Sequence, residues 1–309
     1  MISRVICNIH ERDFVFCGDI DNRVINRHIP KYEGVSIMAT ADSDKKALFE
    51  ALGGMPSLPT PSTSDLNIIL KLSYDNIEPG QVAAAILDEQ KLVAKILEII
   101  DPGSRKIRQP ADAVKRAVEL LGVLKVRRIV HNSFLMNIFD EEEKQEWDHA
   151  YTASLLMAFI LEDQKIAVTA DLPLVMLVHD IGKLVLRRFA TVRYNLVRMR
   201  SEQEKTPLHA LEESFFHATH AEIGNWLLGR WQLADETLKL VRYHHVEEPP
   251  PDLQRETILV QFVNWVDNMA RGRFAAPPSE KLAKHVELEI ADSQLWIDGQ
   301  REFIKAIST

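Results

Sequence analysis

Histidine and aspartate residues that could bind metal ions recur through the second half of the sequence. Imidazole nitrogens and carboxylate oxygens suit divalent first-row metals, and no cysteine lies in this part of the chain. The series consists of His149, His179, Asp180, His220, His244, His245 and Asp267. A carboxylate can bridge two cations, and two cations about 3.5–4 Å apart can activate water and hold a phosphate. The series therefore predicts a site for divalent cations (Fe, Mn, Mg or Zn), with room for two.

Each member of this series has an ordinary structural explanation when it is taken alone. His149 could be a surface residue at a helix start, and His220 a partly exposed helical histidine. His244–His245 could cap the C-terminus of a helix, where cations are favoured, and Asp267 could lie on a solvated turn. The adjacent His–Asp pair is different because it follows the apolar run 174–178 and is expected to be buried, which is costly without partners. Together the residues favour a metal site.

A series of helices is expected to position these residues. From residue 41 onward apolar residues recur at helical spacing, as over 114–121, with almost no sustained alternation. The short runs 5–7 and 14–17 are β-prone and are separated from the helical part by turn-forming residues. The sequence therefore predicts an all-α fold, a helical bundle in which any strand, such as a short hairpin, is confined to the first forty residues.

The chain is expected to divide into three parts. Residues 1–40 form an N-terminal arm, residues 41–145 an N-terminal helical subdomain, and residues 146–309 the helical subdomain that carries the metal site with a C-terminal tail. The charged run 140–144 could mark the boundary between the two helical parts, although a solvated loop or helix end is favoured for the run itself. A core-facing stripe is predicted over 152–159, and Pro277–Pro278 is expected to end the helix that contains Asp267.

Composition narrows the classes of function. The chain has 309 residues and a formal net charge of -8, which disfavours non-specific nucleic-acid binding but leaves room for a small anion at a local cationic site. Its only cysteines, Cys7 and Cys17, form no zinc-binding motif, and a reduced cytoplasmic location is the simpler interpretation. No apolar run approaches the roughly 18–20 residues of a membrane span, so no membrane association is expected.

The segment 178–186, Val-His-Asp-Ile-Gly-Lys-Leu-Val-Leu, resembles the central motif of the HD superfamily of metal-dependent phosphohydrolases. More narrowly, the chain resembles the HDOD family of bacterial signalling proteins over roughly Leu52 to His245. Further segments that resemble this family, in order, are 54–59, 86–97, 112–122 and 220–231. The resemblance implies an HD-domain-like helical bundle that carries two-metal ligands at the seven residues of the series. It implies no assigned activity.

Two departures from these families concern the activity. Asp101–Pro102 stands where the HDOD family more often has an Asn-Ser pair. The chain also lacks the Gly-Tyr-Pro element of the related cyclic-dinucleotide phosphodiesterases, since it reads Val-Glu-Glu-Pro-Pro-Pro after His245. The second departure puts cyclic-dinucleotide hydrolysis in doubt.

The predicted cation sites can be stated residue by residue. His149, His179, Asp180 and Asp267 are expected to converge on one cation. His220, with His244 or His245, is expected to converge with Asp180 on a second. His209 and His217 are expected to lie outside, because only His220 has the matching Gly224 four residues on.

Two functions from different classes remain open. The first is a regulatory signalling module that binds a partner protein or a small phosphate or nucleotide ligand, and the family resemblance favours it. The second is a metal-dependent phosphohydrolase or phosphodiesterase acting on a nucleotide or cyclic nucleotide, with Asp180 and Lys183 as catalytic residues. Lys183 follows Asp180 by one helical turn and could hold a substrate phosphate, or could be a solvated lysine at a helix end. The arginines between 187 and 200 could frame an anion pocket, but a solvated basic face is favoured.

Overall fold

The computed structural model describes residues 6–9, 13–16, 41–72, 77–100, 110–278 and 293–307. The chain divides into two compact units, Met1–Thr40 and Ala41–Thr309. In the first unit β1 (Ile6–Ile9) pairs antiparallel with β2 (Asp13–Phe16), with Ile6 opposite Phe16. These strands coincide with the predicted β-prone runs. They are the only strands within the described residues, which confirms the predicted all-α class for the rest.

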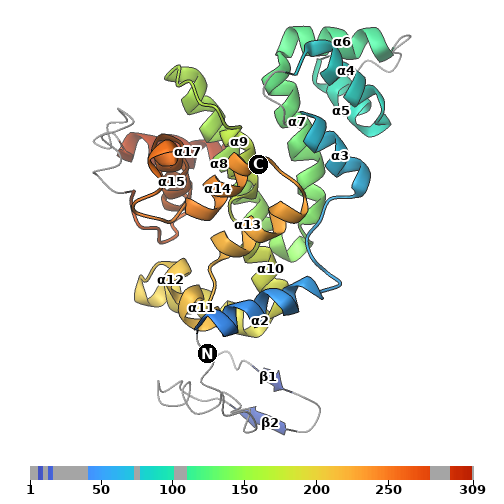
Figure 1. Ribbon diagram of the computed structural model, residues 1–309. Helices are drawn as coiled ribbons and strands as arrows, with labels where there is room; N and C mark the ends of the chain where they lie inside the picture. The colour runs from blue at the N-terminus through green and yellow to red at the C-terminus, as the bar shows by residue number, and fades with distance from the viewer. Residues whose placement is uncertain are drawn as a thin grey trace. The chain divides into compact units, whose positions relative to one another are not determined.

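The second unit begins with α2 (Ala41–Gly53), which packs against α13 (His220–Arg230) through Lys45–Glu222 and Phe49–Trp226. The next five helices form a small bundle of their own (Figure 1). They are α3 (Thr63–Leu72), α4 (Pro79–Leu87), α5 (Gln90–Ile100), α6 (Pro110–Leu121) and α7 (Val123–Leu135). Helix α6 packs against α4, α5 and α7. The predicted stripe over 114–121 supplies buried residues to this core, including Val114 and Val118. The departure at Asp101–Pro102 lies outside the described residues.

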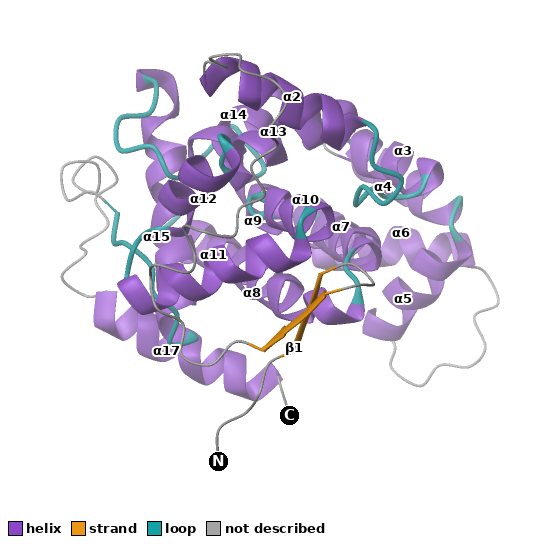
Figure 2. Ribbon diagram, turned by 90° about the horizontal axis from the view of Figure 1, so that it is seen from below, coloured by secondary structure: helices purple, strands orange, loops and turns teal. Residues whose placement is uncertain are grey.

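The remaining helices pack around the segment that carries the His–Asp pair. They are η1 (Met136–Ile138), η2 (Glu141–Glu143), α8 (Lys144–Asp163), α9 (Leu172–Val178), α10 (Ile181–Phe189), α11 (Thr191–Glu204), α12 (Leu208–Phe216), α13 (His220–Arg230), α14 (Asp235–Tyr243), η3 (Pro251–Leu253), α15 (Gln254–Ala270) and α17 (Ser293–Ile307). Helix α8 packs along α9 and α15, and α10 packs along α13. Figure 2 shows helices joined by loops throughout the described part of this unit. None of these helices combines the length and the apolar character needed to cross a membrane.

Local sequence signals fix where the site helices begin. The Asp171 side chain accepts a hydrogen bond from the Leu174 amide at 3.2 Å and so caps α9. Thr219 and Glu222 form a reciprocal capping box at the start of α13. Asp171 caps the helix that leads to His179, and Thr219 directly precedes His220, the first residue of α13. The residues that start the helices therefore also set the positions of the candidate ligands.

Two details differ from the expectations. Helix α15 ends at Ala270 rather than at Pro277–Pro278, because Gly272 adopts a φ of +72° that stops the helix first. In the predicted stripe over 152–159, Phe159 is 56% exposed and packs edge-on against Trp296 of α17. The predicted division between residues 145 and 146 falls in the first turn of α8 and stays a prediction.

A buried polar cluster joins α7 to the start of α9. The Arg127 Nε atom lies 3.0 Å from Asp171 Oδ2, and the Arg127 guanidinium also donates to the Leu72 carbonyl at 3.4 Å. His131 is buried beside them, with its Nδ1 atom 3.9 Å from Asp171 Oδ2. Burial lowers the pKa of His131 to about 4, and Asp171 only partly opposes this. His131 is therefore neutral at physiological pH.

Acid should destabilise the protein through His131. The pKa of this side chain is about 4 in the folded chain and about 6.5 in an unfolded one, so protonation favours unfolding. The stability that depends on neutral His131 is complete above about pH 6.5 and is lost as the pH falls towards about 4. Between about pH 7.5 and about pH 4.5, the wild-type chain should lose about 2–3 kcal/mol more unfolding free energy than His131→Gln.

Urea unfolding of the metal-free protein, followed by circular dichroism at both pH values, measures this difference. The other buried histidines are common to both chains and cancel in the comparison. Equal losses in the wild type and in His131→Gln would contradict the assignment.

Candidate metal centre

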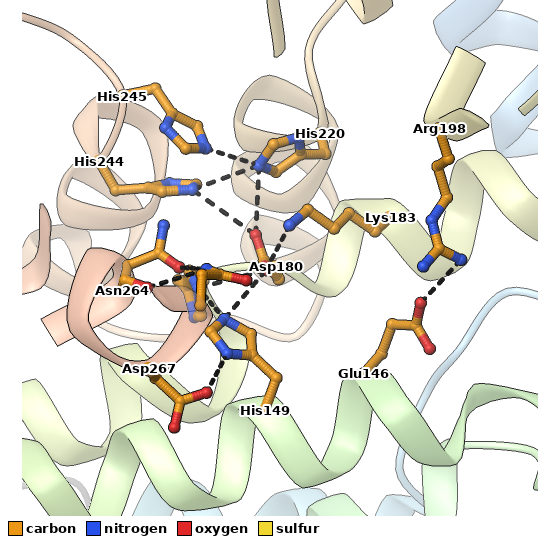
Figure 3. Close-up of polar contacts among 12 residues, drawn as sticks. Glu146, His149, Asp180, Lys183, Arg198, His220, His244, His245, Asn264 and Asp267 are labelled. Carbon is orange, nitrogen blue, oxygen red and sulfur yellow. Dashed lines mark hydrogen bonds and ion pairs between the residues drawn. The ribbon is translucent and has the colours of Figure 1, made fainter. Parts of the chain in front are cut away.

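The His–Asp pair lies at a break between two short helices. His179 is the C-cap of α9 and Asp180 is the N-cap of α10. Both side chains are buried, with 0% and 6% of their residue surface exposed. Because the backbone bends here, the two side chains face the same interior point, where histidines from other helices meet them (Figure 3).

The first group contains His149, His179 and Asp180, whose ligand atoms all lie within 4.8 Å of one another. The His149 Nε2 atom is 3.3 Å from His179 Nε2 and 3.5 Å from Asp180 Oδ2. The His179 Nε2 atom is 3.3 Å from the same carboxylate oxygen. Two imidazoles and one carboxylate oxygen thus converge from α8 and from the α9–α10 break.

The second group contains Asp180, His220, His244 and His245. Here the other carboxylate oxygen is used, since Asp180 Oδ1 lies 3.2 Å from His220 Nε2 and 3.7 Å from His244 Nε2. The His220 Nε2 atom is also 3.3 Å from His244 Nε2 and 3.0 Å from His245 Nε2. Asp180 is therefore shared by the two groups, one oxygen to each, as a bridging ligand requires.

Carboxylates behind two of the histidines fix the direction in which each ring faces. The His149 Nδ1 atom lies 2.6 Å from Asp267 Oδ2, and the His220 Nδ1 atom lies 2.5 Å from Glu212 Oε2. Each Nδ1–H donates to an ionised oxygen, so in the neutral ring the lone pair is on Nε2. Carboxylate partners of this kind are common behind metal-binding histidines.

Backbone carbonyls fix the ring directions of two further histidines, His179 and His244. The His179 Nδ1 atom donates to the Met176 carbonyl at 2.8 Å, and the His244 Nδ1 atom donates to the Val241 carbonyl at 2.6 Å. In the neutral rings, four Nε2 lone pairs consequently face the interior of the cluster. The buried Asp180 Oδ1 atom also has no hydrogen-bond partner among the described residues. Imidazole and carboxylate acceptors that converge in this way suit a cation, so the residues present fit divalent metal ions.

The protonation equilibria of several groups agree with this arrangement. Burial by itself raises the pKa of the Asp180 carboxyl, but His179 and Lys183 outweigh it and hold that pKa well below its usual value. Burial lowers the pKa of His244 to about 3. Burial, together with the histidines around it, also lowers the pKa of His245 well below its usual value. These three side chains are deprotonated at neutral pH, as metal ligands must be.

The pKa values of His149 and His220, the two histidines with a carboxylate behind the ring, shift in the opposite direction. Burial lowers the pKa of His149, but hydrogen bonds to Asp180 and Asp267 raise it overall. Burial likewise lowers the pKa of His220, and its attraction to Glu212 raises it overall. Positive charge is therefore favoured at these Nε2 atoms, and a metal ion would compete there with a proton.

Asp267 lies outside both groups, although the sequence predicted it as a ligand. Its Oδ2 atom is held by His149 and by Arg271 Nε at 2.7 Å, and its Oδ1 atom accepts from Thr152 Oγ1 and Gln300 Nε2, both at 2.6 Å. Both oxygens face this network. The structure thus places Asp267 behind His149, where it orients the ring.

The two histidines expected to lie outside the site differ from each other. His217 is 44% exposed by side chain and lies 3.8 Å from Asp44 Oδ2. His209 belongs to neither group, but its ring stacks on His245 with centroids 4.4 Å apart. Burial, with repulsion from His220, lowers the pKa of His209 to about 4. His209 therefore lies against the cluster as a neutral side chain.

Glycines allow the crossing that brings Asp180 to His220. A Cβ atom on Gly182 would lie 2.0 Å from the His220 carbonyl oxygen and 2.8 Å from the Gly224 amide nitrogen. The backbones of α10 and α13 can approach this closely only if residue 182 has no side chain. Gly182 follows Asp180 by two residues, so this contact places the shared carboxylate beside His220.

The cation groups open into a cavity of about 880 Å³. Its lining includes Asp180, Lys183, Arg198, His209 and Asn264. The Lys183 Nζ atom lies 2.5 Å from Asp180 Oδ2, so this lysine is at the boundary between the cluster and the cavity (Figure 3). Sequence analysis did not identify Asn264 or Glu212, because neither belongs to a recognisable spacing.

Comparison with known proteins assigns the family. The HDOD domain model matches residues 58–247, more than half of the chain. The chain belongs to the HDOD family. An uncharacterized protein of Treponema pallidum is 24% identical to this HDOD chain over 253 residues, 79% of the chain but only 48% of the relative. The chain therefore corresponds to about half the length of that relative.

Solved structures share this HDOD fold. An HDOD domain protein of unknown function from Geobacter sulfurreducens has a TM-score of 0.62 at 21% identity, over 85% of this chain and 89% of its own. A protein named as a candidate signal transduction protein, from Marinobacter aquaeolei, has a TM-score of 0.64 at 18% identity, over 88% and 66%. A protein named as a candidate phosphohydrolase, from Shewanella amazonensis, has a TM-score of 0.57 at 12% identity, over 82% and 98%.

Gly182→Ala should disrupt the centre, because the added methyl group overlaps the His220 carbonyl and forces α10 away from α13. We expect loss of metal binding and a fall of at least about 2 kcal/mol in unfolding free energy. Gly229→Ala is the matched control, since a Cβ there meets nothing within 4 Å in the same helix α13. It should keep metal and gain about 0.5–1 kcal/mol. Metal analysis and thermal unfolding measure both; normal metal content in Gly182→Ala would contradict the crossing.

Asp267→Asn and Glu212→Gln should each weaken the binding of one of the two cations. The first variant removes the carboxylate behind His149 and the second removes the one behind His220, so each should lower the affinity of its own group about 10–100-fold. The other group serves as the internal control. Titration with cobalt, followed by its absorption spectrum, resolves the two steps. Complete loss of the first cation in folded Asp267→Asn would instead indicate that Asp267 is a direct ligand.

Proposed function

We propose that this HDOD chain is a regulatory module that binds two divalent cations at the shared Asp180 carboxylate and uses them to hold a small phosphate-bearing ligand. The observation that carries the proposal is the set of inward-facing Nε2 atoms, whose Nδ1 atoms are already committed to acceptors. His149 and His179 would hold one cation, and His220, His244 and His245 the other. When bound, the cations supply positive charge for a phosphate and lower the pKa of water.

Lys183 couples the cluster to the cavity. Its ammonium group pairs with Asp180 Oδ2 and lines the cavity, with 20% of its side chain exposed. The lysine holds the shared carboxylate in place and adds a positive charge on the ligand's side. A phosphate bound at the cations would lie within reach of the Lys183 ammonium, which acts as a point charge and can contact the phosphate from many directions.

Family membership supports the regulatory function, since the HDOD family is one of bacterial signalling proteins and membership in it implies no assigned activity. Hydrolysis of a phosphoester is the second candidate, and the open cavity beside the two groups favours it. The Shewanella amazonensis protein named as a candidate phosphohydrolase shares this fold at 12% identity. A shared fold does not carry an activity from one protein to another. Turnover separates the two functions.

Asp180→Ala should remove both cations, because it deletes the one carboxylate that the two groups share. Asp252→Ala, which changes an exposed carboxylate outside the cavity, should keep both. Elemental analysis of protein purified without an affinity-tag metal provides the measurement. Retention of both cations in Asp180→Ala would overturn the proposal.

The same preparations, loaded with manganese or iron, should be screened against phosphomonoester, phosphodiester and cyclic-dinucleotide substrates. Absence of turnover supports the regulatory module. If turnover occurs, Lys183→Ala should keep its metal and lower the rate on the order of 10²-fold, as expected for loss of one electrostatic contact in the transition state. An unchanged rate would exclude Lys183 from the reaction.

A further inference from the structure

The cavity is lined by three basic side chains, and two of them are paired with acids. The Lys183 ammonium lies 2.5 Å from Asp180 Oδ2, and Arg198 Nη1 lies 3.0 Å from Glu146 Oε1. Arg273 also lines the cavity, but its guanidinium has no hydrogen bond or ion pair with any residue that the structure describes. Among the described residues, Arg273 is therefore the basic side chain of the cavity wall without a protein partner.

The backbone fixes the position of Arg273. After α15 ends, the Gly272 amide donates to the Met269 carbonyl at 3.0 Å and the Arg273 amide donates to the Asn268 carbonyl at 2.9 Å. With Gly272 at a φ of +72°, these two bonds form a Schellman motif. The residue before the glycine, Arg271, is tied to Asp267 and to Thr152 Oγ1. Arg271 is thus held in the network around Asp267, and the motif places Arg273 at the cavity.

The electrostatic surroundings of Arg273 are unfavourable for a lone cation. Burial lowers its pKa, Arg271 and Arg198 lower it further, and Glu146 and Asp267 oppose this only in part. A partly buried charge without a partner is costly, and a charged ligand relieves that cost. No described residue gives the guanidinium a hydrogen bond or ion pair, so an anion in the cavity would supply the compensating charge.

The remaining wall combines carboxylates such as Glu202 and Glu247 and several amide side chains with an apolar and aromatic part. Trp265 and Phe274 line the cavity beside Arg273, and Met199 of α11 lines it as well, with 54% of its surface exposed. Flat aromatic faces of this kind suit a nucleobase, which stacks with little regard to its identity. The volume of about 880 Å³ lies within the range of small-molecule sites.

We propose that Arg273 is a second anion-binding point, and that the cavity takes a nucleotide with two separate phosphate groups, one at the cations and one on the Arg273 guanidinium. The base lies against Trp265 and Phe274. This inference rests on the proposed function, because the first phosphate requires the cations. It adds that a single phosphate uses only part of the site.

Adenosine 5′-monophosphate and adenosine 3′,5′-bisphosphate are the probes, titrated by calorimetry into manganese-loaded protein. The wild type should bind the bisphosphate about tenfold more tightly than the monophosphate, since a charge-assisted hydrogen bond to a partly exposed arginine is worth about that factor. Arg273→Gln should lose this gain and keep its affinity for the monophosphate. Arg255→Gln, at an exposed arginine in helix α15, should keep both.

Equal affinities for the two probes in the wild type, or an undiminished gain in Arg273→Gln, would overturn the inference. Metal content is measured in the same samples, so absence of bound manganese would overturn the proposed function as well. Bound manganese without the gain would overturn only the second anion-binding point.

Melting temperatures of the metal-free variants test whether Arg273 has a structural partner. Arg273→Gln should melt no lower than the wild type, because it loses no described ion pair. Arg271→Gln should melt lower, because it breaks the bonds to Asp267 and Thr152. An equal fall in both variants would overturn the inference.

Discussion

Burying the Asp180 carboxylate carries a desolvation penalty of several kcal/mol unless opposite charge lies around it. Lys183 supplies one positive charge at Oδ2. His149 and His179 approach Oδ2, and His220 and His244 approach Oδ1. The Oδ1 atom nevertheless keeps no hydrogen bond among the described residues. The break between α9 and α10 and the glycine crossing of α10 with α13 both serve to bring imidazoles to this one side chain.

Each cation group combines two kinds of histidine. In the first group His149 is backed by a carboxylate and His179 by a backbone carbonyl; in the second, His220 is backed by a carboxylate and His244 by a carbonyl. The carbonyl acceptors lie three residues before their histidines, so local helix geometry creates them. The carboxylate acceptors come from other helices and make those rings more basic. Each group therefore contains one ring fixed by local geometry and one fixed by tertiary packing.

This difference explains how far the sequence could predict the site. Helices with clear apolar spacing were predictable, and the histidine series itself indicated a cluster. Asp267 resembled a ligand because residue type alone does not reveal which way a side chain faces. Its partners Thr152, Arg271 and Gln300 are 115, 4 and 33 residues away. Glu212 and Arg273 belong to no motif, since their roles depend on contacts between helices that only the folded chain brings together.

Helix α10 connects the cation centre with the short helices η1 and η2. Asp180 caps its N-terminus, and Arg188 lies in its last turn. Arg188 binds the buried Glu143 carboxylate through Nε at 2.9 Å and Nη2 at 2.5 Å, and it also donates to the Ile138 carbonyl at 2.8 Å. A nine-residue helix does not bend easily, and interiors this closely packed transmit displacement. The helix that holds Asp180 against His220 therefore also holds η1 and η2 in place, so the geometry of the centre and the packing of η1 and η2 constrain each other.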